Sequence, residues 1–322
     1  MAKLTRRTFI AAAGAAVAAP ALAAFPDKPI RIIVPWNAGA AADVMTRAIG
    51  IAMAQSSGPP VVVDNRPGAN GAIGSQAVSR AQPDGYTLLV SNADTHAINP
   101  FVFRKLAYDP LKGFEPVSLF AHVPFALVAG PSRPQITDLK SFVATAKASP
   151  STLTFASWGN GSTSHIGMEI IMRSVGIEMT HVPFTGQSPG LLAVQGGQVD
   201  AMLLTAGGAD AAAKGGLVKM LGLAADKRLP LMASTPTLKE LGVDVLAGNW
   251  FALHAPAGTP ADVVRQLSDY TARALQDAKV QEILRLQAAV GESSSPDTLG
   301  RFVVAEQARW GRIVRAANIV ID

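Results

Sequence analysis

The chain has 322 residues, of which 49% are apolar and 16% are charged, so it is not a disordered chain and is long enough for two domains with buried cores. It has no cysteine, which excludes disulfides, thiolate zinc sites, cysteine-ligated iron–sulfur clusters and cysteine nucleophiles. The formal charge of +5 includes three basic residues among the first 23, and the +2 that remains without them does not favour a nucleic-acid partner.

Residues 1–23 have the pattern of an export signal. Basic residues precede the apolar stretch Phe9–Ala19, which is too short for a membrane-spanning helix of about 20 residues. An A-x-A-type cleavage site ends at Ala23. The pair Arg6-Arg7 fits a twin-arginine signal, and an ordinary Sec signal with two adjacent arginines is the alternative. We expect a protein of the periplasm or cell exterior, cleaved near Ala23, whose remaining sequence has no membrane-spanning segment.

Strands and helices alternate in the first part of the mature chain, which predicts βαβ units on a parallel sheet. The predicted elements are a strand at Ile30–Val34, a helix over about 42–55, a strand at Val61–Val63, a short helix ending near Arg80 and a strand at Tyr86–Val90.

Two long extended stretches, Phe114–Ala129 and Gly248–Ala255, enclose a second alternating series, and helices complete the chain. The second series consists of helices over 138–148, 164–175 and 189–195, strands at Leu153–Ala156, His181–Phe184 and Ala201–Leu204, and an apolar run at Val218–Ala224. The final helices are predicted over 260–275, 278–286 and 298–316.

This order predicts an α/β protein with two lobes joined by two crossover hinge strands. The first lobe is expected to comprise 24–120 and 255–322, and the second 121–254 with the hinge strands. A chain that crosses twice between lobes leaves a cleft, which is the default place for a small ligand.

Three loops that follow strands and open helices are the strongest candidates for a binding site: 36–41, 157–163 and 185–188. The carboxyl ends of strands line the ligand crevice of open α/β sheets. Helix N-termini present free N–H groups there, and small residues let an anion approach the backbone. Small residues also make ordinary tight turns, so the equivalent placement of all three loops is what favours a binding role.

The loop 91–96 follows another strand and is a further candidate, unless its side chains satisfy only their own backbone. Trp36 and Trp158 are expected as pocket walls, whereas Asp43 is expected to complement its own helix. The predicted ligand-binding residues, with no catalytic residue and no metal ligand among them, are Trp36, Asn37, Ala38, Gly39, Ala40, Ala41, Asn92, Asp94, Thr95, Ser157, Trp158, Gly159, Ser162, Thr163, Thr185, Gly186 and Thr205.

Two enzymatic alternatives are weak. The segment 186–190 matches G-x-S-x-G, with Asp200 and His254 following in hydrolase order. However, the residue after the serine is Pro189, which lacks the N–H that an oxyanion hole needs. His165 and His181 stand alone in the sequence without metal-ligand spacing, so no metal is expected. Gly159 and Gly161 are followed by Ser164 rather than by the third glycine of a dinucleotide fingerprint, so no cofactor is expected.

An ordered set of segments resembles the Bug family, the substrate-binding proteins of tripartite tricarboxylate transporters, over essentially the whole mature chain. The segments are 29–35 (PIRIIVP), 63–69 (VDNRPGA), 83–88 (PDGYTL), 159–162 (GNGS) with His165, 181–184 (HVPF), 196–200 (GGQVD), Pro236-Thr237 with Glu240, and 255–260 (APAGTP).

The resemblance implies a two-lobed periplasmic binding protein of type II with Venus-flytrap closure, and ligands that are commonly carboxylates, including aromatic acids and amino acids. This chain departs from the family pattern in its first ligand loop, where alanines replace the second glycine and the threonine. Ala40 must therefore avoid left-handed backbone angles. Phe184 replaces the usual tyrosine, which predicts a more apolar pocket.

The sequence thus predicts a monomeric periplasmic receptor that binds a small organic carboxylate and delivers it to the membrane permease subunits of a tripartite transporter. We expect a ligand with an aromatic or longer aliphatic body, and a preference for small hydrophilic acids such as malate would contradict this. A sensor component for a membrane histidine kinase and an exported enzyme are the alternatives. Neighbouring permease or kinase genes would separate the first two, and turnover of a bound acid would indicate the enzyme.

Overall fold

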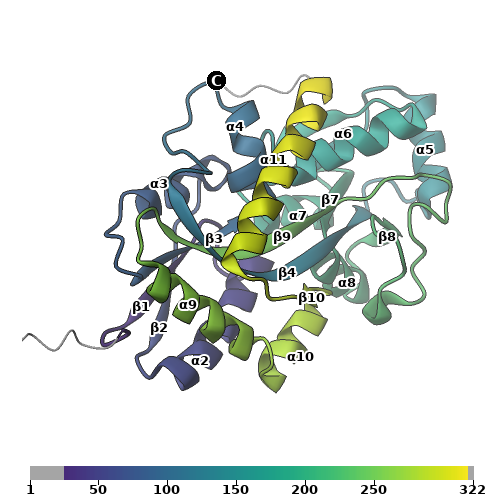
Figure 1. Cartoon of the computed structure of the whole chain (residues 1–322). Coiled ribbons are helices and arrows are strands. Elements are labelled where there is room, and N and C mark those ends of the chain that lie inside the picture. The colour runs from purple at the N-terminus through teal and green to yellow at the C-terminus, as the bar shows by residue number, and fades with distance from the viewer. Residues whose placement is uncertain (1–24, 318–322) are drawn as a thin grey trace, which may run out of the picture.

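The computed structural model of the chain describes residues 25–317. The predicted export signal, residues 1–23, lies outside this range. Among the described residues, every helix is too short or too polar to cross a bilayer. As predicted, the elements form two α/β lobes (Figure 1). The strands of both lobes belong to one ten-stranded sheet.

The first lobe contains the strand order β2-β1-β3-β9-β4. The strand β1 is parallel to β2 and β3, and β9 is antiparallel to β3 and β4. The elements are β1 (Ile30–Val34), α2 (Ala41–Ser57), β2 (Val61–Asn65), η1 (Ala69–Gly71), α3 (Ala72–Ser79), β3 (Thr87–Asn92), η2 (Asp94–Ile98), α4 (Asn99–Val102), β4 (Phe114–Ala129), β9 (Gly248–Pro256), α9 (Ala261–Ala274), α10 (Ala278–Leu286), β10 (Val290–Gly291) and α11 (Pro296–Ala317).

The second lobe continues the sheet in the order β4-β7-β5-β6, with β8 also paired to β4. The strand β5 is parallel to β6 and β7, and β4 is antiparallel to β7 and β8. The elements are α5 (Leu139–Ala148), β5 (Thr154–Ser157), α6 (Thr163–Val175), β6 (Thr180–Pro183), α7 (Gln187–Gln195), β7 (Ala201–Thr205), α8 (Ala206–Lys214), β8 (Lys219–Leu223) and η3 (Pro230–Met232).

The strand β4 belongs to both lobes because its pairing changes along its length. Up to Pro124 it pairs with β9, and from Phe125 onward it pairs with β7 and β8. The chain returns from the second lobe to the first beside this point of β4. There the backbone oxygen of Ala247 accepts a hydrogen bond from Phe125 N–H, and Gly248 pairs with Pro124. The predicted limits of the lobes at 120/121 and 254/255 fall inside β4 and β9, and they stay a prediction.

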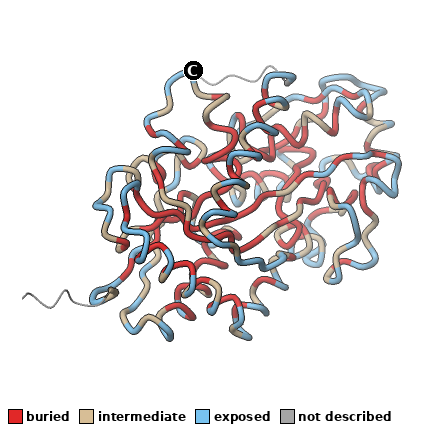
Figure 2. The backbone as a smooth tube through the Cα atoms, viewed as in Figure 1, coloured by how far each residue is buried: buried red, intermediate tan, exposed pale blue. Residues whose placement is uncertain are grey.

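Alternating side chains divide each lobe into layers around the sheet. In β1, Ile30, Ile32 and Val34 pack with α2, α9 and α10, whereas Ile33 packs with Val78 of α3 on the other face. The second lobe repeats this arrangement, with separate apolar clusters on the two faces of its strands. Figure 2 shows the buried backbone concentrated in the strands and exposed backbone at the loops.

The structure corrects two predictions and contains one helix that the sequence did not predict. The sheet is mixed, since the crossover strands must run back between lobes and are therefore antiparallel to their neighbours. The helix α8 was not predicted, because two consecutive glycines in its first turn lower its helix propensity. The candidate loop at 91–96 is instead the end of β3 followed by the buried π-helical turn η2.

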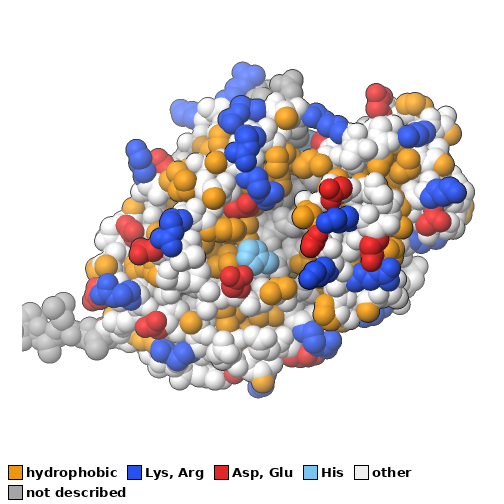
Figure 3. Space-filling model, turned by 45° about the vertical axis from the view of Figure 1, so that its right-hand side comes forward, with side chains coloured by type: hydrophobic (Ala, Val, Ile, Leu, Met, Phe, Trp, Pro, Cys, Tyr) orange, Lys and Arg blue, Asp and Glu red, His pale blue; other side chains and the backbone are white. Residues whose placement is uncertain are grey.

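On the face in Figure 3, basic and acidic side chains are intermingled, with apolar side chains between them.

Candidate ligand-binding site

A cavity lies between the two lobes, where strands of both end and helices begin. Its cavity volume is about 40 Å³, within about 470 Å³ of empty space that includes its open mouth. The lining combines four aromatic rings, six polar side chains and four small residues, and it includes no Lys, Arg or His. The lining residues are Trp36, Asn37, Ala40, Ala41, Ala42, Asn92, Asp94, Phe125, Trp158, Gly186, Gln187, Thr205, Asn249 and Phe251.

The first lobe contributes the N-terminus of α2. Gly39 has a φ of +80°, in the left-handed region that favours glycine, whereas the N-cap residue Ala40 has a φ of −69°. The expectation that Ala40 avoids left-handed angles is therefore confirmed. No side chain caps α2. The N–H of Ala40 donates to the backbone oxygen of Asn37 at 3.2 Å, whereas the N–H groups of Ala41 and Ala42 at the cavity wall have no side-chain acceptor from a cap.

Asp43 serves its own helix, as predicted. Its Oδ2 accepts a hydrogen bond from Gly39 N–H at 2.9 Å, and Arg47 and Asn65 bond to the same carboxylate. Burial raises the pKa of Asp43, but these hydrogen bonds outweigh burial and hold the pKa below its ordinary value. Asp43 therefore organises the loop and is not part of the cavity lining.

Asp94 joins the two lobes through hydrogen bonds. It comes from η2 in the first lobe, and it is completely buried. Its Oδ1 accepts a hydrogen bond from the N–H of Thr163, the first residue of α6 in the second lobe, at 2.6 Å. Its Oδ2 accepts hydrogen bonds from Asn92 Nδ2 at 3.0 Å and from Trp158 Nε1 at 3.2 Å. A carboxylate of the protein itself thus occupies the N-terminus of α6.

Two further helix N-termini at the cavity have no side-chain cap. They are those of α7, preceded by Gly186, and of α8, preceded by Thr205. The hydroxyl oxygen of Thr205 is buried and has no hydrogen-bond partner, although its backbone N–H donates to Gln187 Oε1 at 3.2 Å. An orphan buried hydroxyl beside free helix N–H groups is equipped to bind a polar ligand group.

The aromatic rings form two edge-to-face pairs. In the first lobe, the ring centroids of Trp36 and Phe251 are 5.8 Å apart at an interplanar angle of 85°. The second pair consists of Phe125 in β4 and Trp158 in the second lobe. Their ring centroids are 5.4 Å apart at an interplanar angle of 90°. Both predicted tryptophans therefore line the cavity, and each is held in orientation by a neighbouring ring.

The structure brings together about half of the predicted residues. Gly159 and Thr185 line an adjoining hollow that shares Trp36, Trp158 and Gly186 with the main cavity, and Phe184 also lies there. The predicted residues that line neither space are Ala38, Gly39, Thr95, Ser157, Ser162 and Thr163.

Five lining residues were missed: Ala42, Phe125, Gln187, Asn249 and Phe251. Gln187 lies within the third predicted loop, so its position was a usable signal. Phe125, Asn249 and Phe251 lie in the crossover strands, whose sequence indicated burial but not a direction toward the cleft.

A larger groove, with a volume of about 860 Å³, lies on the outer surface between α9 and the start of α11. None of the predicted residues lines it, and it is built within the first lobe alone. The smaller cavity, which both lobes form, is therefore the candidate ligand site.

Ser162 is expected to affect stability rather than ligand binding. Its hydroxyl accepts the N–H of His165 at 3.3 Å and caps α6. Replacing Ser162 by Ala should lower the free energy of unfolding by about 1 kcal/mol and leave ligand affinity unchanged. Denaturant titration and calorimetry on the variant measure both quantities. A weakened affinity with unchanged stability would return Ser162 to the binding site, as predicted from the sequence.

His165 and His181, which stand alone in the sequence, are stacked in the structure with ring centroids 3.8 Å apart. Burial lowers the pKa of His165 to about 4, and burial together with the neighbouring His165 lowers the pKa of His181 to about 3. His254 in the first lobe is also lowered by burial, to a pKa of about 3, and burial lowers the pKa of His96 well below its ordinary value.

These shifts predict a loss of stability in mild acid. The unfolded chain takes up protons near pH 6.5, whereas the folded histidines stay neutral until the pH approaches 4. The free energy of unfolding should be at its plateau above pH 6.5. It should fall below this pH by up to about 1.4 kcal/mol per pH unit for each histidine. Denaturant titrations from pH 8 to pH 5 measure the slope, and His165→Gln should reduce it. A flat profile in this range contradicts the prediction.

The residues of the G-x-S-x-G alternative are engaged elsewhere. Asp200 accepts hydrogen bonds from Ser132 and Thr154, and His254 Nδ1 bonds to Ser91 at 2.7 Å. Within residues 25–317, no three His, Cys, Asp or Glu side chains converge as a metal site would require.

Two α/β lobes joined by crossover strands, with helix N-termini directed at a cavity between them, define a two-lobed periplasmic solute-binding protein. Solved structures of this class superimpose closely on the chain. One from R. palustris, with adipate, has a TM-score of 0.88 and 31% identity over 92% of this chain and 99% of that chain. MatC from Rhodopseudomonas palustris, with bound malate, has a TM-score of 0.84 and 34% identity over 90% and 100%.

The sequence profile described as "Tripartite tricarboxylate transporter family receptor" matches residues 45–319, and the chain belongs to this family. Among curated relatives, protein BugT of Bordetella pertussis (strain Tohama I) is 33% identical over 310 residues, which cover 95% of this chain and 94% of BugT. The family is one of solute-binding receptors, and the resemblance noted from the sequence is confirmed.

Proposed function

We propose that this chain is an exported receptor that binds a small organic carboxylate between its lobes and delivers it to the membrane permease of a tripartite transporter. The observation that carries the proposal is the set of three uncapped helix N-termini, together with the orphan hydroxyl of Thr205, around one cavity. Two relatives whose structures are described with adipate and with malate support the ligand class.

The ligand carboxylate binds at the N-termini of α2, α7 and α8. Each helix N-terminus carries a partial positive charge and unpaired N–H groups, so an anion is stabilised there without a lysine or arginine. The N-terminus of α6 is not available, because Asp94 already occupies it. The remainder of the ligand lies against Trp36, Phe125, Trp158 and Phe251, which favours an apolar body.

The lobes close on the ligand by bending where both crossover segments pass from one lobe to the other, at Pro124–Phe125 and Ala247–Gly248. Binding stabilises the closed form because the ligand contacts residues of both lobes only in that form. The permease then recognises the closed surface.

A thermal-shift panel tests the ligand class. It contains adipate, malate, benzoate and longer aliphatic acids, together with their uncharged amides. Carboxylates should raise the melting temperature and the amides should not. If no carboxylate stabilises the protein, the proposed function is wrong. If a carboxylate is turned over by the protein, the exported-enzyme alternative replaces it.

Thr205→Val tests the anion site. The variant removes a hydroxyl that has no partner in the protein, so the stability of the ligand-free protein should be unchanged or raised. Affinity for the best carboxylate of the panel should fall about 10- to 100-fold, the equivalent of one hydrogen bond to a charged group. Thr271→Val, in α9 away from the cavity, is the matched control, and its affinity should equal that of the parent. Equal affinities for both variants would remove Thr205 from the site.

A further inference from the structure

We propose that the ligand of this receptor carries a quaternary ammonium group as well as its carboxylate, with the ammonium lying among the aromatic rings beside Asp94. This inference rests on the proposed function, because it assumes that the cavity is the ligand site. The ligand class is then a betaine, a small zwitterion that pairs a trimethylammonium group with a carboxylate.

The hydrogen bonds around Asp94 select its ionised form. The amide of Asn92 is oriented by the N–H of Thr95, which donates to Asn92 Oδ1, so Nδ2 must face Asp94. The amide of Asn249 is oriented in the same way, because its Oδ1 accepts from the N–H groups of Ala93 and Trp250. With an indole N–H and a backbone N–H as further partners, four groups around Asp94 can only donate.

Burial works in the other direction and raises the pKa of Asp94. The surrounding donors favour the ionised carboxylate of Asp94 at neutral pH, because a protonated Asp94 would direct its O–H at groups that are themselves donors. Only the hydroxyl of Thr163, 3.4 Å from Oδ2, would be able to accept that proton.

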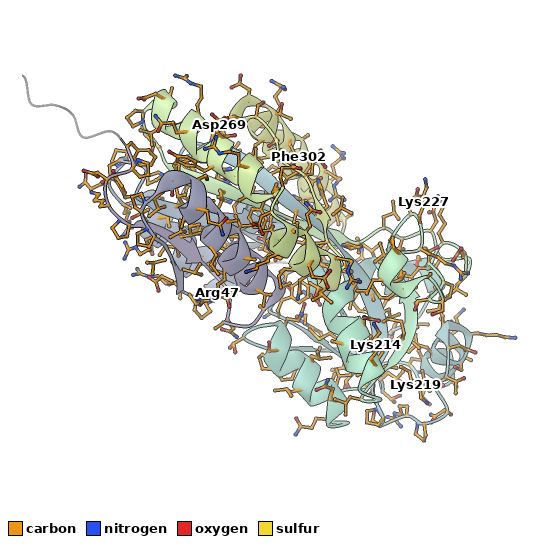
Figure 4. The ribbon with its side chains drawn as sticks, turned by 90° about the horizontal axis from the view of Figure 1, so that it is seen from below. Arg47, Lys214, Lys219, Lys227, Asp269 and Phe302 are labelled. Carbon is orange, nitrogen blue, oxygen red and sulfur yellow. The ribbon has the colours of Figure 1, made fainter. Side chains whose placement is uncertain are left out.

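This negative charge is not balanced by a cation in the cavity lining. The N-terminus of α6 supplies about half a unit of positive charge, and the other partners are neutral dipoles. The basic residues labelled in Figure 4 are not among the residues that line the cavity. Arg47 on α2 bonds to Asp43 and Asn65, and Lys214 pairs with Asp210 on α8. The potential in the cavity next to Asp94 therefore favours a positive ligand group.

The aromatic rings supply the surface that such a group needs. A cation over the face of a tryptophan or phenylalanine ring is attracted by its quadrupole, and quaternary ammonium groups are bound in cages of several rings. Trp36, Trp158, Phe125 and Phe251 provide four rings from both lobes around one cavity. The bond from Trp158 Nε1 to Asp94 fixes the position of that ring against the carboxylate.

The same contacts distinguish a quaternary from a primary ammonium group. Asp94 has no exposed surface, and its Oδ2 already has four donors within 3.4 Å. A primary ammonium group would bring three N–H donors to a carboxylate whose oxygens already accept hydrogen bonds from the protein. A trimethylammonium group has no N–H, so it gains the charge attraction and the ring contacts without an unsatisfied donor.

Matched pairs of ligands test the inference on the unaltered protein by calorimetry. Glycine betaine is compared with 3,3-dimethylbutanoate, and γ-butyrobetaine with 5,5-dimethylhexanoate. In each pair a carbon atom replaces the positive nitrogen, so only the charge differs. The primary amine γ-aminobutyrate is included as a third comparison. The betaine should bind at least about tenfold more tightly than its isostere and than the primary amine.

Two variants locate the effect. Asp94→Asn should reduce the preference for the betaine over its isostere, and Trp36→Leu should weaken betaine binding more than isostere binding. If the isosteres, the plain carboxylates of the panel or γ-aminobutyrate bind as tightly as the betaines, the inference is wrong and the proposed function stands. If no carboxylate of any kind binds, the proposed function fails, and this inference fails with it.

Discussion

Replacing Asp94 by Ala is expected to lower the free energy of unfolding by about 2–4 kcal/mol. Three buried donors, Thr163 N–H, Trp158 Nε1 and Asn92 Nδ2, lose their acceptor, at a cost of about 1–3 kcal/mol each. Relief from burying a charge offsets part of this cost, so the total is smaller than the sum. Denaturant titration of the ligand-free variant at pH 7 measures the change.

Asp226→Ala is the matched control for Asp94→Ala. Asp226 pairs with Lys239 at 2.9 Å on the surface, and both side chains are more than half exposed. Its removal should cost no more than about 1 kcal/mol. If the two variants lose the same stability, then the contacts of Asp94 between the lobes do not contribute to the folded state as we argue.

Replacing Gly207 by Ala is expected to weaken ligand binding about 10- to 100-fold. Gly207 lies in α8 of the second lobe, and an added Cβ would be only 2.6–2.7 Å from three backbone atoms of Gln287, which follows α10 in the first lobe. Such an overlap with backbone cannot be relieved by a rotamer change, so the two lobes must separate. The cost of about 1–3 kcal/mol applies only to the closed form.

The stability of the second lobe should not suffer from this substitution, since alanine is a better helix residue than glycine by about 1 kcal/mol. Gly300→Ala in α11 is the control, because its added Cβ has an ordinary contact of 3.6 Å with Pro116. Calorimetry with the best ligand of the panel should find the control equal to the parent. Equal affinity for Gly207→Ala would mean that the closed form does not bring α8 against Gln287 as it does in this structure.

Asp94 changes the interpretation of the three candidate loops. The loop at 157–163 does lead into a helix whose N-terminus binds an anion, as its small residues predict. The anion is a side chain from the other lobe, so this loop helps to join the lobes, and the ligand carboxylate is left to the other uncapped helices. At the N-terminus of α6, the carboxylate of Asp94 takes the place that the sequence suggested for the ligand. Asp94 is 69 residues away from Thr163 in the sequence.

Local sequence patterns were sufficient for most of the elements. The limits of β4, Phe114–Ala129, and of α10, Ala278–Leu286, agree with the prediction at both ends. Hydrophobic periodicity and turn residues report whether a segment is buried on one face or on both, and this depends on near neighbours in the chain. The same patterns placed Trp36 and Trp158 in loops after strands, which is why both were expected as cavity walls.

Only the tertiary structure decided which groups meet between the lobes. Phe125 and Phe251 are apolar residues in long strands, and the sequence does not indicate that β4 and β9 direct them toward the same cavity. The partnership of Asp94 with Thr163, and the unpaired hydroxyl of Thr205, depend on where the chain returns after each crossover. Such contacts are set by packing between distant segments, so their chemistry becomes visible only when the two lobes are placed together.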